Sequence, residues 1–295
     1  MQFLRFFRAV VESRLNNIWV EFDEIKFIEP TSAMLLASEV HRWKLIRKLQ
    51  YRAKKTGRWH DDIKRMLCDI GTFDLVPVRN SPIVLPIDAP EQFIKIRSGT
   101  NVDLERAIKE IGNQVSQIET FIDSDPSIYG AVQEAITNVI HWAYVDSGAE
   151  VNEVIRQRWW FLASYNRDIR RFSLLVYDHG RGIPKTIRKK FVEEFRTEAL
   201  GILSLFLPVG QWNDSYSIEA AFKYPRSASG HLYRGKGLVE MRNLLDRFTR
   251  GRLQVMSGQG VYTIHCDGRI ESALKKYDIG GTLVAWEIYD TGGLK

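Results

Sequence analysis

Four short motifs of polar residues and glycines occur in a fixed order in this chain, and the first pairs a carboxylate with a carboxamide. In Glu134-Ala-Ile-Thr-Asn138-Val-Ile-His141 the polar residues are spaced by four and then by three positions. A helix would carry Glu134, Asn138 and His141 on one face. The side-chain oxygen of Asn138 is a ligand that Mg²⁺ accepts when phosphate oxygens and waters complete its shell. Glu134, one turn away, would orient or deprotonate an attacking water.

The second motif, Asp178-His-Gly180-Arg-Gly182-Ile-Pro184, directly follows an apolar run that is typical of a buried strand. We therefore expect Asp178 at the end of a strand and partly buried, where a carboxylate needs hydrogen-bond donors. The amino group of an adenine is a suitable donor. Gly180 and Gly182 permit the close backbone approach that a flat base requires.

The third and fourth motifs also contain paired glycines. Gly235-Lys236-Gly237-Leu238 opens a predicted helix, whose free N–H groups and positive dipole end suit a phosphate, and Arg234 adds charge beside it. Gly280-Gly281-Thr282 enters the last predicted strand, where Thr282 would hydrogen-bond near the base. Each motif alone also fits a plainer interpretation: a solvated helix face, an Asp-Gly turn, a glycine loop or a strand residue. Their combination and order predict a nucleotide site.

The apolar periodicity predicts the elements that must hold these motifs. Helices are expected at 31–49, 63–70, 104–122, 128–144, 185–206 and 236–248, and strands at 18–22, 159–163, 172–177, 253–256, 261–265 and 282–289. Helices followed by a meander of strands indicate an α+β sandwich. Four prolines from Pro77 to Pro90 mark a linker. We therefore predict two domains, residues 1–92 and 93–295.

Residues 100–290, with their four motifs, resemble the GHKL superfamily of Bergerat-fold ATP-binding domains, among them gyrase-type topoisomerases, heat-shock chaperones, histidine kinases and anti-sigma-factor kinases. Glu134-Ala-Ile-Thr-Asn138 looks most like the N box of the anti-sigma-factor kinases. The resemblance implies helices on a mixed, mostly antiparallel sheet, with ATP and Mg²⁺ as ligands. It implies Asn138 as the metal ligand and, as in the ATPase branches, Glu134 as the catalytic base. The implied cofactor-binding residues are Asn138, His141, Asp178, Gly180, Gly182, Arg234, Gly235, Lys236, Gly237, Leu238 and Thr282.

The segment 1–92 resembles, more faintly, a STAS domain, the fold of anti-sigma-factor antagonists. Ile18–Leu36 has that fold's strand–turn–helix character, and Leu67–Leu75 has its closing helix and glycine. Thr31 falls where the family carries a phosphorylated hydroxyl, although a threonine at a helix start is commonly a cap. The resemblance implies a small STAS-like α/β module that engages a protein partner.

The composition excludes several classes of protein. The 295 residues are 44% hydrophobic and 26% charged, which is typical of a soluble globular chain. Cys68 and Cys266 form no C-x-x-C pair, so neither a disulfide framework nor a zinc site is expected. The longest apolar run, 200–209, is about half of what a membrane span needs. The N-terminus lacks the features of a signal peptide, and we expect a cytoplasmic protein that does not bind membranes.

Positive charge is concentrated in one part of the chain. The net charge is +6, and the segment Arg42–Arg65 holds ten Lys or Arg residues against only Asp61 and Asp62. Such a segment suits nucleic acid or an acidic partner. A solvated helix face and loop is the plainer interpretation, and no zinc-finger, aromatic RNA-binding or helix-turn-helix pattern supports a nucleic-acid site.

The resemblance leaves three functions open. The first is a GHKL ATPase that acts as a nucleotide-driven switch, with homodimerisation on nucleotide as a further expectation. The second is a Ser/Thr kinase of the anti-sigma type, and the third is an ATP-gated scaffold without catalysis. The second and third motifs resemble the first and second glycine boxes of the family. The long segment Ile183–Tyr233 between these two boxes favours the switch. An autophosphorylating histidine kinase is not expected, because no helical stripe with the usual Arg or Pro follows His60-Asp61, and the 104–122 helix contains no His. A bacterial regulatory protein is suggested by analogy alone.

Overall fold

The central strands of this protein are buried on both faces, which requires cover on each side of the sheet. The computed structural model describes residues 22–48, 51–84, 88–100, 106, 126–145, 152–187, 213–223 and 237–290. In β4 (Trp159–Asn166) and β5 (Arg171–Asp178) almost every residue is buried. Their sequences are accordingly continuous apolar runs and do not alternate between polar and apolar residues.

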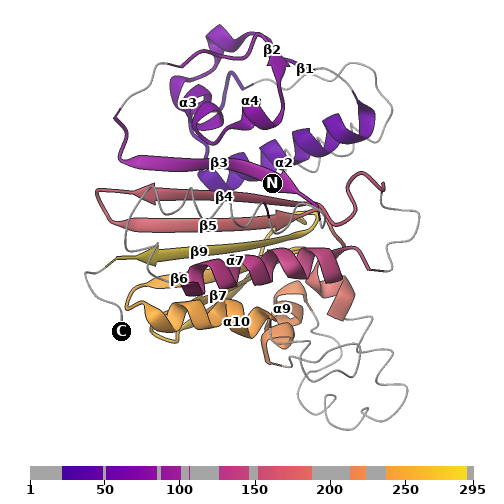
Figure 1. Ribbon diagram of the computed structural model, residues 1–295, viewed down its shortest axis with the longest axis vertical. Helices are drawn as coiled ribbons and strands as arrows, with labels where there is room; N and C mark the ends of the chain where they lie inside the picture. Colours follow the sequence, from indigo (N-terminus) through magenta and orange to yellow (C-terminus); the bar gives the residue numbers. More distant parts are fainter. Residues whose placement is uncertain are drawn as a thin grey trace.

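Seven strands form one antiparallel sheet in the order β3-β4-β5-β9-β6-β7-β8 (Figure 1). Strand β9 joins the two halves, because it pairs with β5 on one side and with β6 on the other. Asp178 and Thr282 are thereby direct cross-strand neighbours. The other strands are β3 (Glu91–Gly99), β6 (Gly251–Ser257), β7 (Gly260–His265), β8 (Ile270–Leu274) and β9 (Thr282–Tyr289).

Three helices cover one face of the sheet and carry the first and third motifs. Helix α7 (Pro126–Asn138) continues directly into a π-helical turn, η3 (Val139–Ala143). Helix α10 (Gly237–Asn243), prolonged by a 3₁₀ turn (Leu244–Arg247), packs beside α7. Helix α9 (Asp214–Lys223) lies mainly against β7. The core between these helices and the sheet contains large aromatic side chains from the strands, including Trp159, Phe161, Phe172, Tyr262 and Trp286.

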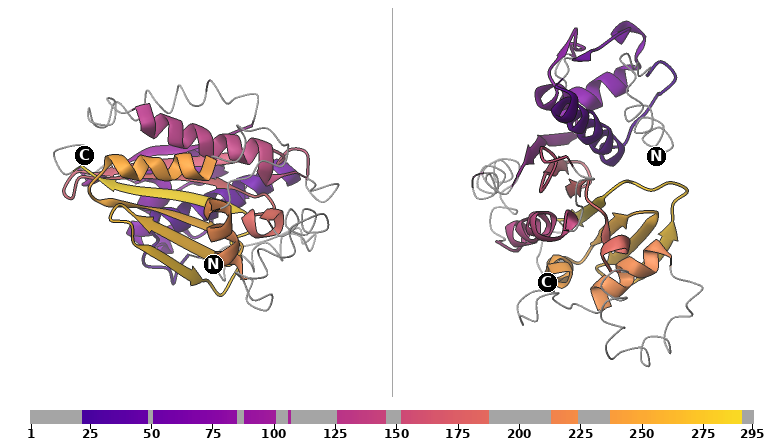
Figure 2. Two further views of the ribbon diagram at one scale, coloured as in Figure 1. Left: turned by 90° about the horizontal axis from the view of Figure 1, so that it is seen from below. Right: turned by 90° about the vertical axis from the view of Figure 1, so that its right-hand side faces the viewer.

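The opposite face is covered by the N-terminal segment, so the molecule has helices on both sides of its sheet (Figure 2). Helix α2 (Pro30–Arg47) begins with proline at its first turn and ends at Lys48, which adopts a left-handed conformation with φ 54°. Helices α3 (Asp61–Asp69) and α4 (Thr72–Leu75) meet at Gly71, whose φ is 76°. A short parallel pair, β1 (Tyr51–Arg52) and β2 (Val78–Arg79), completes this part.

The predicted α+β class is confirmed, and so are the helices and strands expected in the described parts of the chain, within a few residues. Strands β3 and β8 and helix α9 were not predicted. The domain boundary expected at residue 92 falls inside β3, and residues on both sides of it share one buried cluster that includes Leu35, Ile63, Trp160 and Tyr177. The expected 104–122 helix, except Arg106, the expected 185–206 helix beyond residue 187, and most of the 18–22 strand lie outside the described residues.

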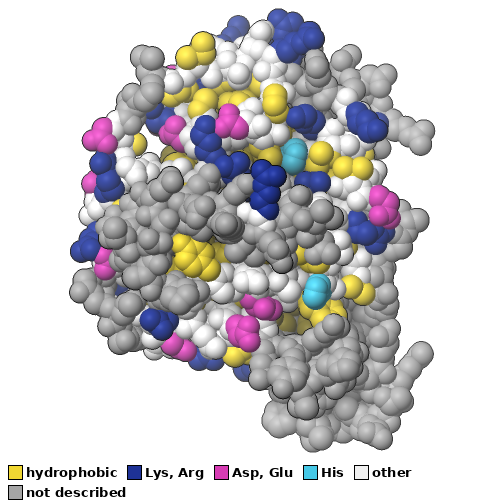
Figure 3. All heavy atoms as spheres, in the orientation of Figure 1, with side chains coloured by type: hydrophobic (Ala, Val, Ile, Leu, Met, Phe, Trp, Pro, Cys, Tyr) yellow, Lys and Arg dark blue, Asp and Glu magenta, His cyan; other side chains and the backbone are white. Residues whose placement is uncertain are grey.

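One face of the molecule displays Lys and Arg side chains of the basic N-terminal part of the chain. Many of them spread over the region of α2, α3 and α4, in the upper half of Figure 3. Several are engaged locally, as in the Lys64–Asp61 ion pair at 2.5 Å. Among the described helices, none is long and apolar enough to cross a membrane.

The central position of β5 predicts a strong and local dependence of stability on its packing. Leu174 is fully buried in the core under α7, whereas Leu274 on edge strand β8 is 54% exposed. Leu174→Ala should lower the free energy of unfolding by about 2–5 kcal/mol, because it leaves a cavity. Leu274→Ala should change it by less than about 0.5 kcal/mol. Urea denaturation measures both free energies, and equal effects would contradict the placement of Leu174 in the core and of Leu274 at the exposed edge.

Candidate functional site

Asp178, the residue that ends β5, has a carboxyl group enclosed by protein. The residue is 3% exposed, and its Oδ1 accepts a hydrogen bond from the backbone N–H of Gly180 at 2.6 Å. Burial raises the pKa of Asp178 to about 7, against the opposing effect of backbone hydrogen bonds from Gly180 and Thr282. A strongly shifted carboxyl at a strand end is a marker of a functional site. The sequence-based prediction placed Asp178 at this position.

Two glycines permit backbone contacts around Asp178 that a side chain would prevent. A Cβ atom on Gly281 would lie 1.9 Å from the carbonyl oxygen of Asp178, and the φ of Gly281 is +156°. A Cβ atom on Gly180 would lie 2.3 Å from the carbonyl oxygen of Ala143, at the end of η3. The second and fourth motifs therefore meet each other and the end of the helix that carries the first.

Ser257, which the sequence analysis did not single out, ties these glycines together. Its Oγ accepts a hydrogen bond from the Ile183 N–H at 2.9 Å and donates one to the carbonyl of Gly281 at 3.1 Å. The hydroxyl of Thr282 lies 3.0 Å from the same oxygen. Gly182, with φ +82°, packs against it, since a Cβ there would lie 2.8 Å from Ser257 Oγ. A serine at the end of a predicted strand offers no distinctive signal in one sequence.

Glu134 and Asn138 form the second group, on α7, and α10 begins against them. A Cβ atom on Gly237 would lie 2.1 Å from Glu134 Oε1 and 2.7 Å from Asn138 Nδ2. Burial raises the pKa of Glu134, the charge of Glu240 raises it further, and a hydrogen bond from Asn138 opposes both. Because the Asn138 amide donates to Glu134, its carbonyl oxygen is left as an acceptor or metal ligand. Gly237 of the third motif thus lies against Glu134, the predicted base, and Asn138, the predicted metal ligand.

His141 is placed differently from Glu134 and Asn138. The α-helical spacing that would align the three residues ends at Asn138, and His141 lies exposed in the wider π turn. Tyr144, just after this turn, has a contact that was not predicted. Its hydroxyl accepts from the backbone N–H of His179 at 3.2 Å and donates to the carbonyl of Arg158 at 2.9 Å. Burial raises the pKa of Tyr144 well above its ordinary value, so the donor proton is retained.

Of the remaining predicted site residues, Leu238 lies in the part of the chain that the structure describes. Leu238 is partly buried and packs against the main core in the first turn of α10. Arg234, Gly235 and Lys236 lie outside the described residues. Among the residues that the structure describes, no group of three or more His, Cys, Asp or Glu side chains could hold a metal ion. Asn138 places a side-chain amide beside Glu134.

The residues around Asp178 and the pair Glu134–Asn138 both lie at α7–η3, the first at the end of η3 and the second on α7. Glu134, beside Gly237, and Ala143, beside Gly180, are nine positions apart in the chain. At about 1.5 Å of rise per residue this is about 13 Å. Such a separation suits an elongated ligand with a base at one end and charged phosphates at the other. No protein-family model and no curated protein matches this chain.

The first glycine box also contacts the helix on the far side of the sheet. The His179 side chain, 4% exposed, brings Nδ1 to 3.5 Å from Oε2 of Glu39 on α2. Glu39 is fully buried, and Arg42 binds it at 2.6 Å. The ring of His179 packs edge-on against Trp160 with the centroids 4.8 Å apart. A buried polar contact therefore connects α2 to the residue next to Asp178.

The raised pKa of Asp178 predicts a pH-dependent stability. Because the pKa of the folded state, about 7, exceeds the reference value of 3.8, the folded protein binds this proton more tightly than the unfolded chain. The associated stability is complete below about pH 4 and is lost as the pH rises through about 7. Asp178→Asn should therefore be more stable than the wild type at about pH 8, by about 2–4 kcal/mol. Urea denaturation across this pH range measures the difference.

Asp168→Asn is the matched control, because Asp168 is exposed in the β4–β5 turn. It should leave the pH dependence of unfolding unchanged. A stability difference between Asp178→Asn and the wild type that does not vary with pH would contradict the assignment of a protonated, buried Asp178.

Proposed function

We propose that this chain binds Mg·ATP between α7–η3, the end of β5 and the start of α10, and hydrolyses it as a nucleotide-driven switch of GHKL type. The observation that supports this best is the meeting of distant motifs on one helix. Gly237 lies against Glu134, and Gly180 lies against Ala143 at the other end. The glycine contacts bring backbone close to both ends without intervening side chains.

At the base end, Asp178 is the residue that would recognise adenine. Its carboxyl is buried and already accepts from the backbone, and the amino group of adenine would supply a further donor. Hydrogen bonds to a charged group in a dry site are stronger than those in water. In Asp178→Asn the remaining side-chain oxygen would still accept from the Gly180 N–H. The new Nδ2 group would then face the adenine amino group, and two donors cannot form a hydrogen bond with each other.

At the phosphate end, Glu134 and Asn138 would divide two tasks. The free carbonyl oxygen of Asn138 fits Mg²⁺, which prefers oxygen ligands and would neutralise charge on the phosphates. The raised pKa of Glu134 makes its carboxylate a better base for a water aligned with the terminal phosphate. Attack of that water forms the new P–O bond, the ADP oxygen leaves, and the proton of the water passes to Glu134.

The contact between His179 and Glu39 favours a switch over the kinase. It fits the ATP-gated scaffold equally, and phosphate release separates that alternative from the switch. His179 follows the adenine-binding residue directly in the chain, so a shift of this turn on nucleotide binding moves a side chain packed against α2. Since Glu39 is fully buried and held by Arg42, α2 must respond to that movement.

Calorimetry with Mg·ATP and a phosphate-release assay test the site. Wild type should bind ATP and release phosphate, and Asp178→Asn should bind at least about tenfold more weakly, from the loss of one charge-assisted hydrogen bond. Glu134→Ala should retain binding and lose at least about 100-fold in phosphate release, as expected for loss of a general base.

Each departure from this result has a definite meaning. Binding without phosphate release by the wild type would refute hydrolysis and leave the kinase and the scaffold, which transfer of labelled phosphate to candidate proteins separates. Absence of ATP binding, or equal binding by wild type and Asp178→Asn, would refute the site itself.

Hydrogen exchange tests the link to α2. Addition of Mg·ATP should slow backbone exchange in residues 30–47, and Glu39→Gln should reduce that protection by weakening the contact with His179. Glu153→Gln is the matched control, because Glu153 also pairs with an arginine three residues later, Arg156, but is exposed. If ATP binds and α2 exchange does not change in the wild type, the switch is wrong while the site stands.

A further inference from the structure

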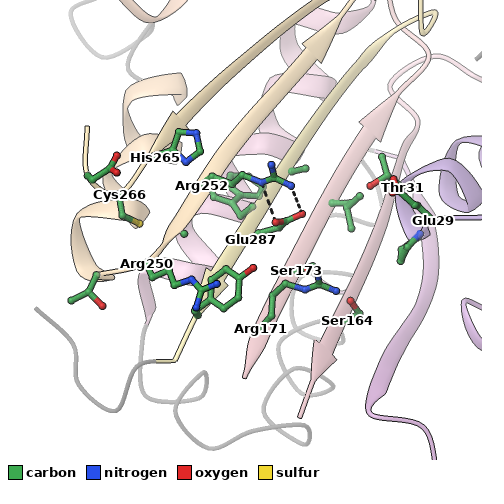
Figure 4. Close-up of a pocket in the computed structure, with 18 of the residues that line it drawn as sticks. Glu29, Thr31, Ser164, Arg171, Ser173, Arg250, Arg252, His265, Cys266 and Glu287 are labelled. Carbon is green, nitrogen blue, oxygen red and sulfur yellow. Dashed lines mark hydrogen bonds and ion pairs between the residues drawn. The ribbon is translucent and has the colours of Figure 1, made fainter. Parts of the chain in front are cut away.

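A groove of about 690 Å³ crosses the face of the sheet that α2 covers only in part (Figure 4). None of the predicted nucleotide-site residues lines it. Its floor is formed by β4, β5, β9, β6 and β7. Glu29 and Thr31, at the start of α2, bound it on one side, and the turn at 266–269 bounds it on the other. Its volume is in the range of ligand-binding pockets.

The floor of the groove is a row of polar residues across all five strands. Ser164, Ser173, Glu287, Arg252 and His265 are successive cross-strand neighbours in the sheet register. Two hydrogen bonds, 2.8 and 3.0 Å long, join the guanidinium group of Arg252 to the Glu287 carboxylate. Along the same strands, the residues that face α7 and α10 are large and apolar. The groove therefore has a floor on which Glu287, Arg252 and His265 are partly exposed, while Ser164 and Ser173 lie deeper.

Three hydrogen-bond donors in the groove have no acceptor among the described residues. Arg250 lies over the ring of Tyr289 at 4.0 Å and forms no ion pair there. Arg171 contacts Glu91 through its terminal nitrogen at 3.2 Å, yet its buried Nε has no partner. The hydroxyl of Ser173, the next residue on the same face of β5, makes no hydrogen bond. Tyr289 is the cross-strand neighbour of Arg171, so the two arginines flank one tyrosine.

The rest of the lining narrows the class of ligand. Carboxylates of Glu29, Asp267 and Glu287 lie among the arginines, which disfavours a continuous polyanion such as a nucleic-acid backbone. At the rim Phe27 is 67% exposed and offers an apolar contact. A ligand that fits both features carries separate carboxylates and at least one apolar side chain.

We propose that this groove binds an extended acidic peptide segment of a partner protein. A carboxylate of the segment is held by Arg250, whose guanidinium group suits bidentate carboxylate binding, and Arg171 adds positive charge on the other side of Tyr289. An apolar side chain packs on Phe27, and Ser173 donates to the peptide. Five strands about 4.8 Å apart span about 19 Å, which an extended chain of about six residues matches at about 3.3 Å per residue. The proposal does not rest on the nucleotide site, because none of the predicted residues of that site lines the groove.

Fluorescence anisotropy with the full-length chain tests this proposal. The probes are dye-labelled peptides of about six residues, the length set by the strand spacing, built from Glu, Asp, Leu, Phe and Ser, with Gln- and Asn-substituted copies as neutral controls. Acidic peptides should bind at least about tenfold more tightly than the neutral copies, because an arginine–carboxylate pair is charge-assisted. Arg250→Gln should remove about that same factor.

Matched variants separate a specific site from general attraction to a basic protein. Arg156→Gln removes the same charge from an arginine that does not line the groove, and should leave the affinity within about twofold, as expected for a distant exposed charge. Phe27→Ser should weaken binding of the Leu- and Phe-containing peptides, and thermal unfolding should show that all three variants are folded. Equal loss in Arg250→Gln and Arg156→Gln, no binding of any acidic peptide, or tighter binding of a short oligothymidine would overturn the proposal.

Discussion

The burial of one carboxyl group, that of Asp178, is the constraint on which the arrangement of the site depends. A buried carboxylate is unfavourable without donors, and here the backbone supplies them from Gly180 and Thr282. Those donors are in reach because Gly281 approaches the Asp178 carbonyl more closely than any residue with a Cβ could. The carboxyl of Asp178 thus depends on the pairing of β5 with β9, on the glycines beside it and on the contact of Gly180 with the end of η3. The pKa of about 7 shows that this arrangement leaves the charged form incompletely stabilised.

The same sheet presents two different faces to two different sets of partners. One face carries α7, α9 and α10 and the nucleotide motifs, and the other carries α2 and the polar groove. Asp178 and His179, at the end of β5, enter different environments, so the turn that follows β5 and α2 meet through one side chain. In this account nucleotide occupancy and partner binding act on opposite sides of a shared sheet.

The sequence predicted the helices, the strands and the positions of the motifs better than it predicted the tertiary contacts between them. Long periodic runs such as those of α7 and β5 were found because burial of a helix stripe or of a whole strand leaves a repeated pattern. Strand β3 was missed because a bulge between Ile94 and Arg97 sends Ile94 and Ile96 to opposite cores. The π turn that holds His141 was not predicted either, because its wider hydrogen-bond spacing leaves no pattern in the sequence. The contacts of Ser257, Tyr144 and Glu39 depend on tertiary packing, which no local pattern in one sequence encodes.

The most direct test of the account is a crystal structure of the protein with Mg²⁺ and a non-hydrolysable ATP analogue. The account predicts the adenine amino group in hydrogen-bond contact with the carboxyl of Asp178, and Mg²⁺ on the side-chain oxygen of Asn138. It also predicts the terminal phosphate beside Glu134 and Gly237. A nucleotide bound elsewhere, in the groove on the far face above all, or a base that makes no contact with Asp178, would contradict it.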